Sequence, residues 1–295
     1  MADADIAAIR TMLASQPRPS GPAERRQRLD SFGSALGVPG DARLEMVRIN
    51  SVQAEWSATP AADPACAVLY LHGGGYMAGS IVSHRYVAIE IGRAARARTL
   101  ALDYRRAPEH PYPAQLDDAL AAYRTLLDQG LTPGKIAVGG DSAGGNLTLA
   151  LLVALRTQGL PLPACGWVVS PWSDLTASGA TMQSKASADP MIQKPYLLEL
   201  AQGFAGGRDL GDPLISPQLA DLTGLPPLLI QVGSEETLLD DSVMLAGRAG
   251  AAGVATTLEI WPDMIHAFTM FFPLVAASRR ATVDAGSFIR RHFGD

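Results

Sequence analysis

Six short runs of consecutive apolar residues recur along the chain, separated by longer segments in which apolar residues have a helical spacing. They span residues 68–71, 99–103, 136–140, 167–170, 228–232 and 257–260. Because these apolar positions are continuous rather than alternating, we expect strands covered on both faces, as in a parallel sheet built from β-α-β units. Upstream, residues 43–49 and 52–57 alternate apolar and polar positions, which is typical of an antiparallel edge pair. The pattern predicts an α/β fold with an eight-stranded, mostly parallel sheet flanked by helices.

Two segments do not fit this alternation of strands and helices. Residues 4–40 begin with a helical pattern and continue through a proline-rich stretch into an arginine-rich one. Residues 176–211 are polar and helical but carry large apolar side chains: Met182, Met191, Tyr196, Leu197, Leu200 and Phe204. These side chains need a partner, and the roof of a cleft would supply one. A simple surface excursion is the alternative interpretation.

The composition argues against several classes of protein. The chain has 295 residues, 47% of them hydrophobic, and a net charge of −5 with no basic block, so we expect neither nucleic acid nor an anionic membrane surface as partner. Residues 1–6 are acidic where a signal peptide would be basic, and no apolar run reaches the roughly 18 residues of a membrane span. We therefore expect a cytoplasmic protein without stable membrane association.

Cys66 and Cys165 lie in apolar surroundings, which favours buried thiols over a disulfide or a metal site.

A serine between glycines, in the sequence GDSAG at residues 140–144, connects an apolar strand to an apolar helix. Such a turn holds its central residue in a strained backbone conformation and brings helix and strand so close that the positions two before and two after it need glycine. Ser142 would then lie at the positive end of a helix, where an oxyanion can be stabilised. The turn predicts a nucleophile, and an ordinary turn in a chain with 29 glycines is the alternative.

Three consecutive glycines follow the apolar run at residues 66–71, in the sequence HGGG at residues 72–75. Such a run is costly in backbone entropy, and one reason for it is that the N–H groups must point into a cavity at close range. A flexible turn is the alternative. Because His72 precedes the glycines, we expect it to anchor the loop by hydrogen bonds rather than to act as a catalytic base.

Together these motifs resemble those of the hormone-sensitive-lipase-like family of α/β-hydrolases, the bacterial family IV esterases. The resemblance extends from about residue 66 to residue 268 and includes further segments at 103–114, 171–175 and 212–217. It implies the α/β-hydrolase fold with a helical cap over the active site. The cap would consist of residues 1–40 and 176–211, and the core of residues 41–175 and 212–295. The resemblance also implies an enzyme without a cofactor and a possible homodimer paired through the last strand and helix.

A serine nucleophile needs a base that takes its proton and a carboxylate that orients the base. In this fold the acid and then the histidine follow the serine, on loops after later strands. Of the five histidines, His266 alone follows the last predicted strand on a loop. For the acid, aligning on the family's usual motif favours Glu236, whereas counting forward from Gly233 favours Glu235. The family more often has aspartate at this position, but the longer glutamate can reach the same imidazole nitrogen.

We expect the other charged residues near these motifs to stabilise the fold and not to take part in catalysis. We expect Asp141 to hydrogen-bond backbone beside the serine turn, and Arg105 to pair with Glu109. Asp240 is interpreted as a helix cap or a pairing residue.

The sequence thus predicts a carboxylic ester hydrolase, a serine carboxylesterase that acts on short- to medium-chain acyl esters of small molecules. Its triad would be Ser142, His266 and Glu236. The oxyanion of the tetrahedral intermediate would be bound by three N–H groups, those of Gly74, Gly75 and Ala143. No metal-binding or dinucleotide motif is present in the sequence. The alternatives are an amidase, a formamidase or a lactonase with the same triad, or a non-catalytic ligand receptor.

Overall fold

One sheet of eight strands forms the centre of the computed structural model, which describes residues 4–294. Residues 1–3 and 295, which the sequence analysis assigned to the cap and the core, lie outside the described residues. The strands are β1 Arg43–Ile49, β2 Val52–Ala58, β3 Asp63–Leu71, β4 Ala97–Leu102, β5 Ile136–Asp141, β6 Cys165–Val169, β7 Leu228–Gly233 and β8 Thr256–Trp261. Their order is β1-β2-β4-β3-β5-β6-β7-β8. β2 runs antiparallel to both of its neighbours, and the other neighbouring pairs are parallel, which confirms the predicted mostly parallel sheet.

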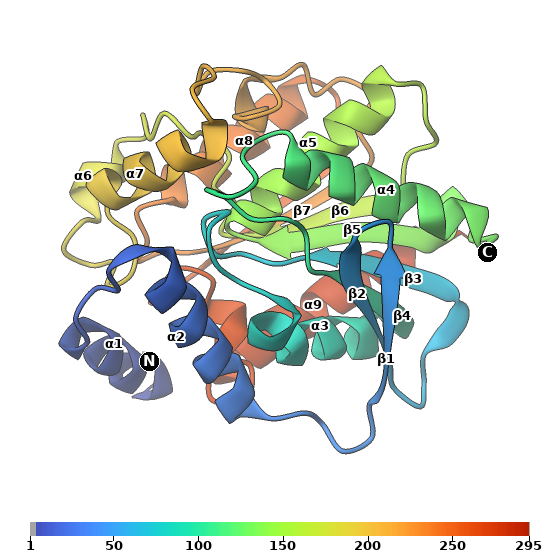
Figure 1. Cartoon of the computed structure of the whole chain (residues 1–295), viewed down its shortest axis with the longest axis horizontal. Helices are drawn as coiled ribbons and strands as arrows, with labels where there is room; N and C mark the ends of the chain where they lie inside the picture. Colours follow the sequence, from blue (N-terminus) through green and yellow to red (C-terminus); the bar gives the residue numbers. More distant parts are fainter. Residues whose placement is uncertain (1–3, 295) are drawn as a thin grey trace.

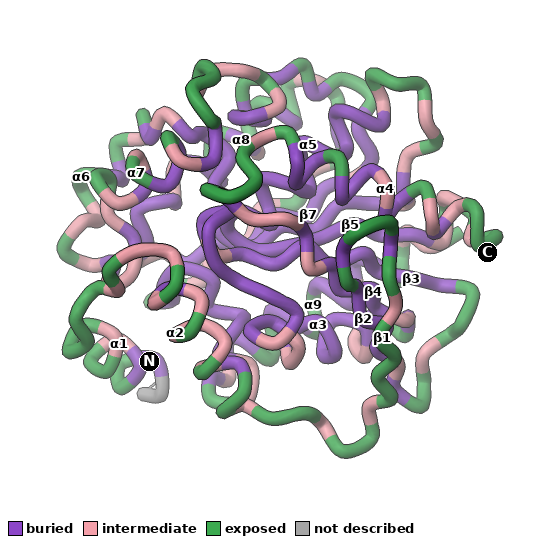
Figure 2. The backbone as a smooth tube through the Cα atoms, viewed as in Figure 1, coloured by how far each residue is buried: buried purple, intermediate pink, exposed green. Residues whose placement is uncertain are grey.

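Helices cover both faces of this sheet (Figure 1). α3 (Ile81–Ala95) and α9 (Ala276–His292) pack on one face, and α4 (Ala114–Asp128), α5 (Ala143–Thr157) and α8 (Leu239–Ala251) pack on the other. Short 3₁₀ helices η1 (Pro133–Lys135), η2 (Pro217–Leu219) and η3 (Phe268–Phe271) lie in the connections. All residues of β5, β6 and β7 are buried, and Figure 2 shows this buried centre. The continuous apolar runs therefore mark strands that helices cover from two sides, as the pattern predicts.

Four strands begin earlier than their apolar runs. β3 starts at Asp63, β4 at Ala97, β6 at Cys165 and β8 at Thr256. The first three residues of β3 are exposed, and its register with β4 shifts between Asp63 and Ala67. The hydrophobic pattern identifies only the part of β3 that lies between the helical layers, so the exposed start of the strand is not visible in it.

Four further helices lie outside this three-layer arrangement, at one end of the molecule (Figure 1). They are α1 (Ala4–Ser15), α2 (Gly21–Leu36), α6 (Thr181–Ser184) and α7 (Lys194–Ala205). Several contacts join the two segments; for example, Arg10 donates to the carbonyl oxygen of Ala188 at 3.0 Å, and Arg25 pairs with Glu199 at 2.8 Å. The helices of the early segment and those of residues 176–211 therefore lie side by side, and the cap boundaries taken from the sequence stay a prediction.

The expected ion pair between Arg105 and Glu109 is wrong. Arg105 pairs with Asp118 of α4 at 2.8 Å, and Glu109 pairs with Arg26 of α2 at 2.6 Å. The carboxylate of Asp118 also accepts the backbone N–H of Arg105 at 2.9 Å. The backbone and the side chain of Arg105 therefore both donate hydrogen bonds to Asp118. Arg26 in turn ties the early helical segment to the loop after β4.

Both cysteines are free and buried, as predicted, and burial raises the pKa of the Cys165 thiol to about 12. Within residues 4–294, no group of three or more histidine, cysteine, aspartate or glutamate side chains could hold a metal ion.

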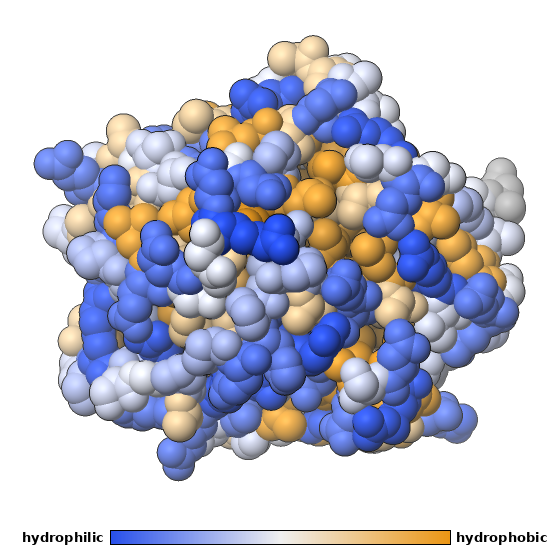
Figure 3. Space-filling view, turned by 45° about the horizontal axis from the view of Figure 1, so that its top comes forward, coloured by the Kyte–Doolittle hydropathy of each residue, from blue (hydrophilic) through white to orange (hydrophobic). Residues whose placement is uncertain are grey.

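No helix in the described part of the chain is long and apolar enough to cross a membrane. On the face in Figure 3, hydrophilic side chains predominate and hydrophobic ones gather in smaller groups between them. β8 is an edge strand, and the homodimer expected through it and α9 stays a prediction.

Candidate active site

Ser142 lies in the turn between the end of β5 and the start of α5. Its backbone angles are φ 54° and ψ −119°, a strained conformation for a residue with a side chain. A Cβ atom added at Gly140 or at Gly144 would overlap the carbonyl oxygen of Leu71 at the end of β3. The glycines two before and two after the serine are therefore required by close approach, and they let the turn present the hydroxyl above the sheet edge.

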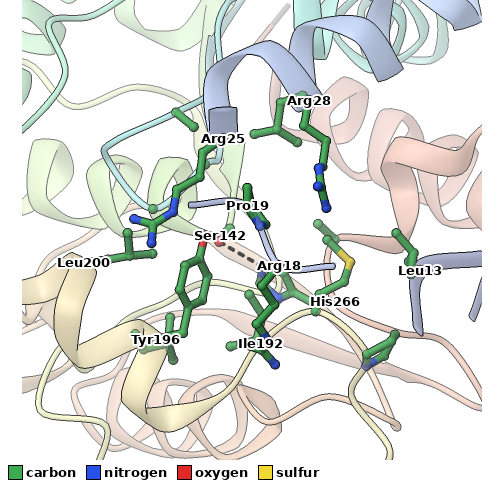
Figure 4. A pocket seen from close by; sticks show the side chains of 18 of the residues that line it. Leu13, Arg18, Pro19, Arg25, Arg28, Ser142, Ile192, Tyr196, Leu200 and His266 are labelled. Atoms are coloured by element: carbon green, nitrogen blue, oxygen red, sulfur yellow. Dashed lines mark hydrogen bonds between the residues drawn. The ribbon is translucent and has the colours of Figure 1, made fainter. Parts of the chain in front are cut away.

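The imidazole of His266 lies between Ser142 and Glu236. Its Nε2 is 2.9 Å from the hydroxyl oxygen of Ser142, and its Nδ1 is 3.0 Å from Oε2 of Glu236. The exposed fractions of the three residues are 8% for Ser142, 3% for His266 and 0% for Glu236. Glu236 follows β7 and His266 follows β8, and both strands run parallel to β5 within the same sheet, so the three loops meet at one edge. Figure 4 shows the hydrogen bond between Ser142 and His266 from the side of the pocket.

The other carboxylate oxygen of Glu236, Oε1, also accepts hydrogen bonds. Oε1 accepts the hydroxyl of Ser170 at 2.8 Å and the backbone N–H of Gly233 at 2.5 Å. The same Ser170 hydroxyl oxygen accepts the N–H of Ala267, next to His266, at 3.1 Å. Ser170 thus links the loops of the acid and the histidine, and the sequence analysis had placed it only at the end of a strand. Its role depends on contacts between distant loops, for which one sequence gives no signal.

The neighbouring acidic residues face other partners. Glu235 pairs with Lys185, between α6 and α7, at 3.1 Å, and its side chain is 26% exposed. Asp240 accepts the backbone N–H of Thr181 at the start of α6 at 2.9 Å, as expected of a helix-cap or pairing residue. The structure therefore brings Glu236, and not Glu235, within hydrogen-bonding distance of His266.

Burial and charge act in opposite directions on the buried pair. Burial disfavours the imidazolium, but the hydrogen bond and the negative charge of Glu236 outweigh it, so the pKa of His266 is raised above its ordinary value. Burial raises the pKa of Glu236, while the hydrogen bond to His266 and the N–H of Gly233 favour its ionised form. An imidazole with a raised pKa beside a serine hydroxyl is suited to accept a proton from it.

The glycine loop is fixed by the residue before the serine. One oxygen of Asp141 accepts the N–H of Gly73 at 3.1 Å and the hydroxyl of Tyr70 at 2.6 Å, as expected for a carboxylate that binds backbone beside the turn. Nδ1 of His72 contacts the carbonyl oxygen of Gly73 at 2.8 Å, and the Tyr104 hydroxyl donates to the carbonyl oxygen of His72 at 2.6 Å. Burial lowers the pKa of His72 to about 3, so its imidazole is neutral at pH 7. These bonds agree with an anchoring role for His72.

The three predicted oxyanion donors lie beside the serine. Gly74 and Gly75 line the same cavity as Ser142, and within residues 4–294 their N–H groups donate to no acceptor. Gly74 has φ +113°, and an added Cβ would overlap the backbone of Ala78, so only glycine fits. Ala143 is the first residue of α5, where a backbone N–H has no partner within the helix. Unpartnered N–H groups beside a buried hydroxyl can stabilise negative charge that develops there.

Asp189 is a buried carboxylate that the sequence analysis did not single out. It lies between α6 and α7, and its exposed fraction is 3%. One oxygen accepts the N–H groups of Met191 and Ile192 at 2.8 Å each, and the other accepts the N–H of Thr237 at 2.9 Å. Because Thr237 directly follows Glu236, one side chain joins the pocket wall to the loop of the acid. The Asp-Pro dipeptide indicates a turn, but it gives no sign of this distant partner.

A cavity of about 480 Å³ lies against Ser142 and His266. Its walls come from the link between α1 and α2, from α2 itself, from the start of α7, from the glycine loop and from η3. Side chains that face it in Figure 4 include Arg18, Arg25, Arg28, Ile192, Tyr196 and Leu200. The Ser142 hydroxyl, the His266 imidazole and the backbone of Gly74 and Gly75 thus line the same pocket as both helical segments outside the sheet.

This sheet order with a serine turn after β5 defines an α/β hydrolase, and comparison with known proteins gives the same class. The family described as alpha/beta hydrolase fold matches residues 68–270. A crystal structure of an esterase from the bacterial hormone-sensitive lipase family is similar over 100% of both chains, with a TM-score of 0.96 and 43% identity. The chain belongs to the hormone-sensitive-lipase-like family of esterases within the α/β hydrolases.

Two further relatives are close in sequence. An acetyl-hydrolase from Streptomyces hygroscopicus is 46% identical over 267 residues, which cover 90% of this chain and 87% of the relative. The crystal structure of EstE5 soaked by p-nitrophenyl butyrate is 43% identical, with a TM-score of 0.94 over 98% of both chains.

Proposed function

We propose that the chain is a serine carboxylesterase that hydrolyses short- to medium-chain acyl esters through an acyl-enzyme intermediate. The observation that carries the proposal is the pair of hydrogen bonds made by the His266 imidazole, to Ser142 at 2.9 Å and to Glu236 at 3.0 Å. A hydroxyl, an imidazole and a carboxylate in this order activate a serine for acyl transfer. The names of relatives, among them an acetyl-hydrolase, support an ester as the substrate.

In the first half of the proposed reaction, the Ser142 oxygen attacks the ester carbonyl carbon while its proton passes to Nε2 of His266. The negative charge of Glu236 stabilises the imidazolium that forms. The carbonyl oxygen becomes an oxyanion that accepts hydrogen bonds from the N–H groups of the glycine loop and of the first residue of α5. When this intermediate collapses, the bond to the leaving oxygen breaks, His266 protonates that oxygen, and the acyl group remains on Ser142.

In the second half, His266 takes a proton from a water molecule whose oxygen attacks the acyl carbon. The oxyanion forms again in the same place. Collapse of this second intermediate breaks the bond to Ser142, which recovers its proton from His266, and the carboxylic acid leaves. The proposed cycle needs no group beyond the side chains and N–H groups of this chain and water.

The cavity supports a substrate of modest size. About 480 Å³ falls within the range of small-molecule sites, and apolar side chains such as Ile192, Leu200 and Met270 line it. Each methylene group that becomes buried against such side chains contributes about 0.8 kcal/mol. We therefore expect kcat/KM to rise with acyl length over short chains and to fall once the chain exceeds the cavity.

Hydrolysis of p-nitrophenyl acetate, butyrate, octanoate and palmitate by the purified protein tests the proposal. We expect the highest kcat/KM with a short or medium acyl chain, and Ser142→Ala should lower kcat by roughly 10⁴-fold. Ser287→Ala on the far helix α9 is the matched control and should leave turnover unchanged. Near-normal hydrolysis by Ser142→Ala would overturn the mechanism, and faster turnover of the matching anilides or of lactones would favour the alternative activities.

A further inference from the structure

Three arginines line the part of the cavity that lies away from the sheet. Arg25 and Arg28 extend from α2, and Arg18 extends from the link between α1 and α2 (Figure 4). Among the described residues that line the cavity, the carboxylates are Asp141, which binds the glycine loop, and Glu199, which pairs with Arg25. The wall opposite the serine therefore has an excess of positive charge in a protein whose net charge is −5.

Arg25 is the buried member of this group. Its side chain is 7% exposed, and its pairing with Glu199 at 2.8 Å leaves Nε without a hydrogen-bond partner in the described part of the chain. Its guanidinium carbon lies 4.9 Å from the centre of the Tyr196 ring. A buried guanidinium with an unsatisfied N–H is costly unless another group comes close to it.

Arg18 is the exposed member, and its guanidinium carbon lies 5.9 Å from the centre of the same Tyr196 ring. Within residues 4–294, no carboxylate lies within ion-pair distance of it. Arg28, by contrast, is shared between Glu24, at 3.3 Å, and the carbonyl oxygen of Pro17, at 2.6 Å. Arg18 and Arg25 thus both lie near one aromatic ring of the wall, and in the described part of the chain Arg18 has no carboxylate partner.

We propose that the substrates of this enzyme carry a carboxylate remote from the ester bond, and that Arg18 binds this carboxylate beside Tyr196. A guanidinium offers two parallel N–H groups that match the two oxygens of a carboxylate. A cleft with an excess of one sign of charge also raises the local concentration of ligands of the opposite sign. The inference rests on the proposed ester hydrolysis at Ser142. The carboxylate can belong to the acyl part or to the alcohol part of the ester, and the two arms of the test distinguish these sources.

The test compares charged and neutral esters of matched shape. For the acyl side, mono-p-nitrophenyl adipate is compared with p-nitrophenyl hexanoate, and for the alcohol side, 4-acetoxybenzoate is compared with its methyl ester. The measured quantity is the ratio of kcat/KM for the anionic ester to kcat/KM for its neutral partner. In Arg18→Gln we expect this ratio to fall about twofold to fivefold in one of the two arms. Arg18→Glu should lower it further.

Arg124→Gln, on the surface of α4, is the matched control because it removes the same charge away from the cavity. It should leave the ratio unchanged. Raising the ionic strength from about 0.02 M to about 0.3 M should lower the wild-type ratio in the same arm.

Equal ratios in wild type and both Arg18 variants, in both arms, would overturn the inference while hydrolysis of the neutral esters still supports the proposed function. Absence of hydrolysis of every ester by the wild type would overturn the proposed function itself.

Discussion

His266 determines the pH dependence of the proposed reaction. Burial lowers the pKa of its imidazole, but the hydrogen bond and charge of Glu236 raise it more, and the net pKa lies above 6.5. Since the base must be neutral, kcat/KM should fall as the pH drops through this raised value. We expect the highest activity on the alkaline side, measured as kcat/KM for a neutral ester between about pH 5 and pH 9. A flat profile down to about pH 5, with the protein still folded, would contradict a histidine base.

Glu236 and Glu235 are neighbours whose roles one pair of variants separates. Glu236→Gln removes the charge that raises the pKa of His266 and presents the wrong hydrogen-bonding group to Nδ1, so we expect kcat to fall about 10⁴-fold. The acid limb of the remaining activity should also move to lower pH. The measurement is a pH profile of kcat/KM for both variants.

Glu235→Gln is the matched control. It loses a partly exposed pair with Lys185, which contributes at most about 1 kcal/mol to stability, and it should keep nearly normal turnover. If Glu235→Gln were inactive and Glu236→Gln active, the assignment of the acid would be wrong. Thermal melts show whether each variant is folded.

The segment between α6 and α7 acts on the acid loop through Asp189. Its carboxylate accepts the N–H of Thr237, and its charge contributes to the raised pKa of His266. Asp189→Asn places an amide where three backbone N–H groups need an acceptor, and we expect kcat to fall about tenfold or more. The acid limb of kcat/KM should shift to lower pH, which a purely structural defect would not cause.

The control for this change is Asp209→Asn, an exposed residue after α7 that accepts the N–H of Gly211. It should leave both kcat and the pH profile as they are. An Asp189→Asn protein with a lower melting temperature but an unchanged acid limb would show that Asp189 only stabilises the fold.

The strands and the serine turn can be predicted from the sequence because local physics determines them. Continuous apolar runs mark strands covered by helices, and the glycines around Ser142 are required wherever a strand and a helix meet this closely. The family resemblance, which the comparisons confirm, adds the order of the acid and the histidine. The exposed start of β3 escapes the pattern because no helix covers it.

Other features cannot be predicted from one sequence because they depend on contacts between distant segments. Arg105 reaches Asp118, thirteen positions on, because the loop after β4 turns toward α4, and the nearer Glu109 is drawn to Arg26. Ser170 and Asp189 likewise find their partners on loops that only the folded sheet brings together. The spacing of residues along the sequence does not show which distant segments come close together in the fold.

The stability of the whole molecule should depend on pH through His72, which is buried, stacked on Tyr104 and has a pKa of about 3. In the unfolded chain this imidazole has a pKa near 6.5, so the unfolded state binds a proton between these values that the folded state does not. The free energy of unfolding should therefore fall as the pH drops below 6.5. Between pH 7 and pH 5 this one group accounts for about 2 kcal/mol.

Urea unfolding of the wild type and of His72→Gln at both pH values measures this contribution. The variant should lose less stability between pH 7 and pH 5, by about the amount that one histidine supplies. Equal losses in the two proteins would mean that His72 has the same pKa in the folded and the unfolded state.

The proposed mechanism depends on Ser142 being a nucleophile made reactive by His266. Diisopropyl fluorophosphate reacts with such a serine and leaves a covalent phosphoryl group on its oxygen, which intact-mass and peptide spectra locate. We expect one adduct per chain, on Ser142, none in Ser142→Ala, and much slower labelling in His266→Gln. No adduct on the active wild-type protein, or an adduct on a different residue, would contradict the account.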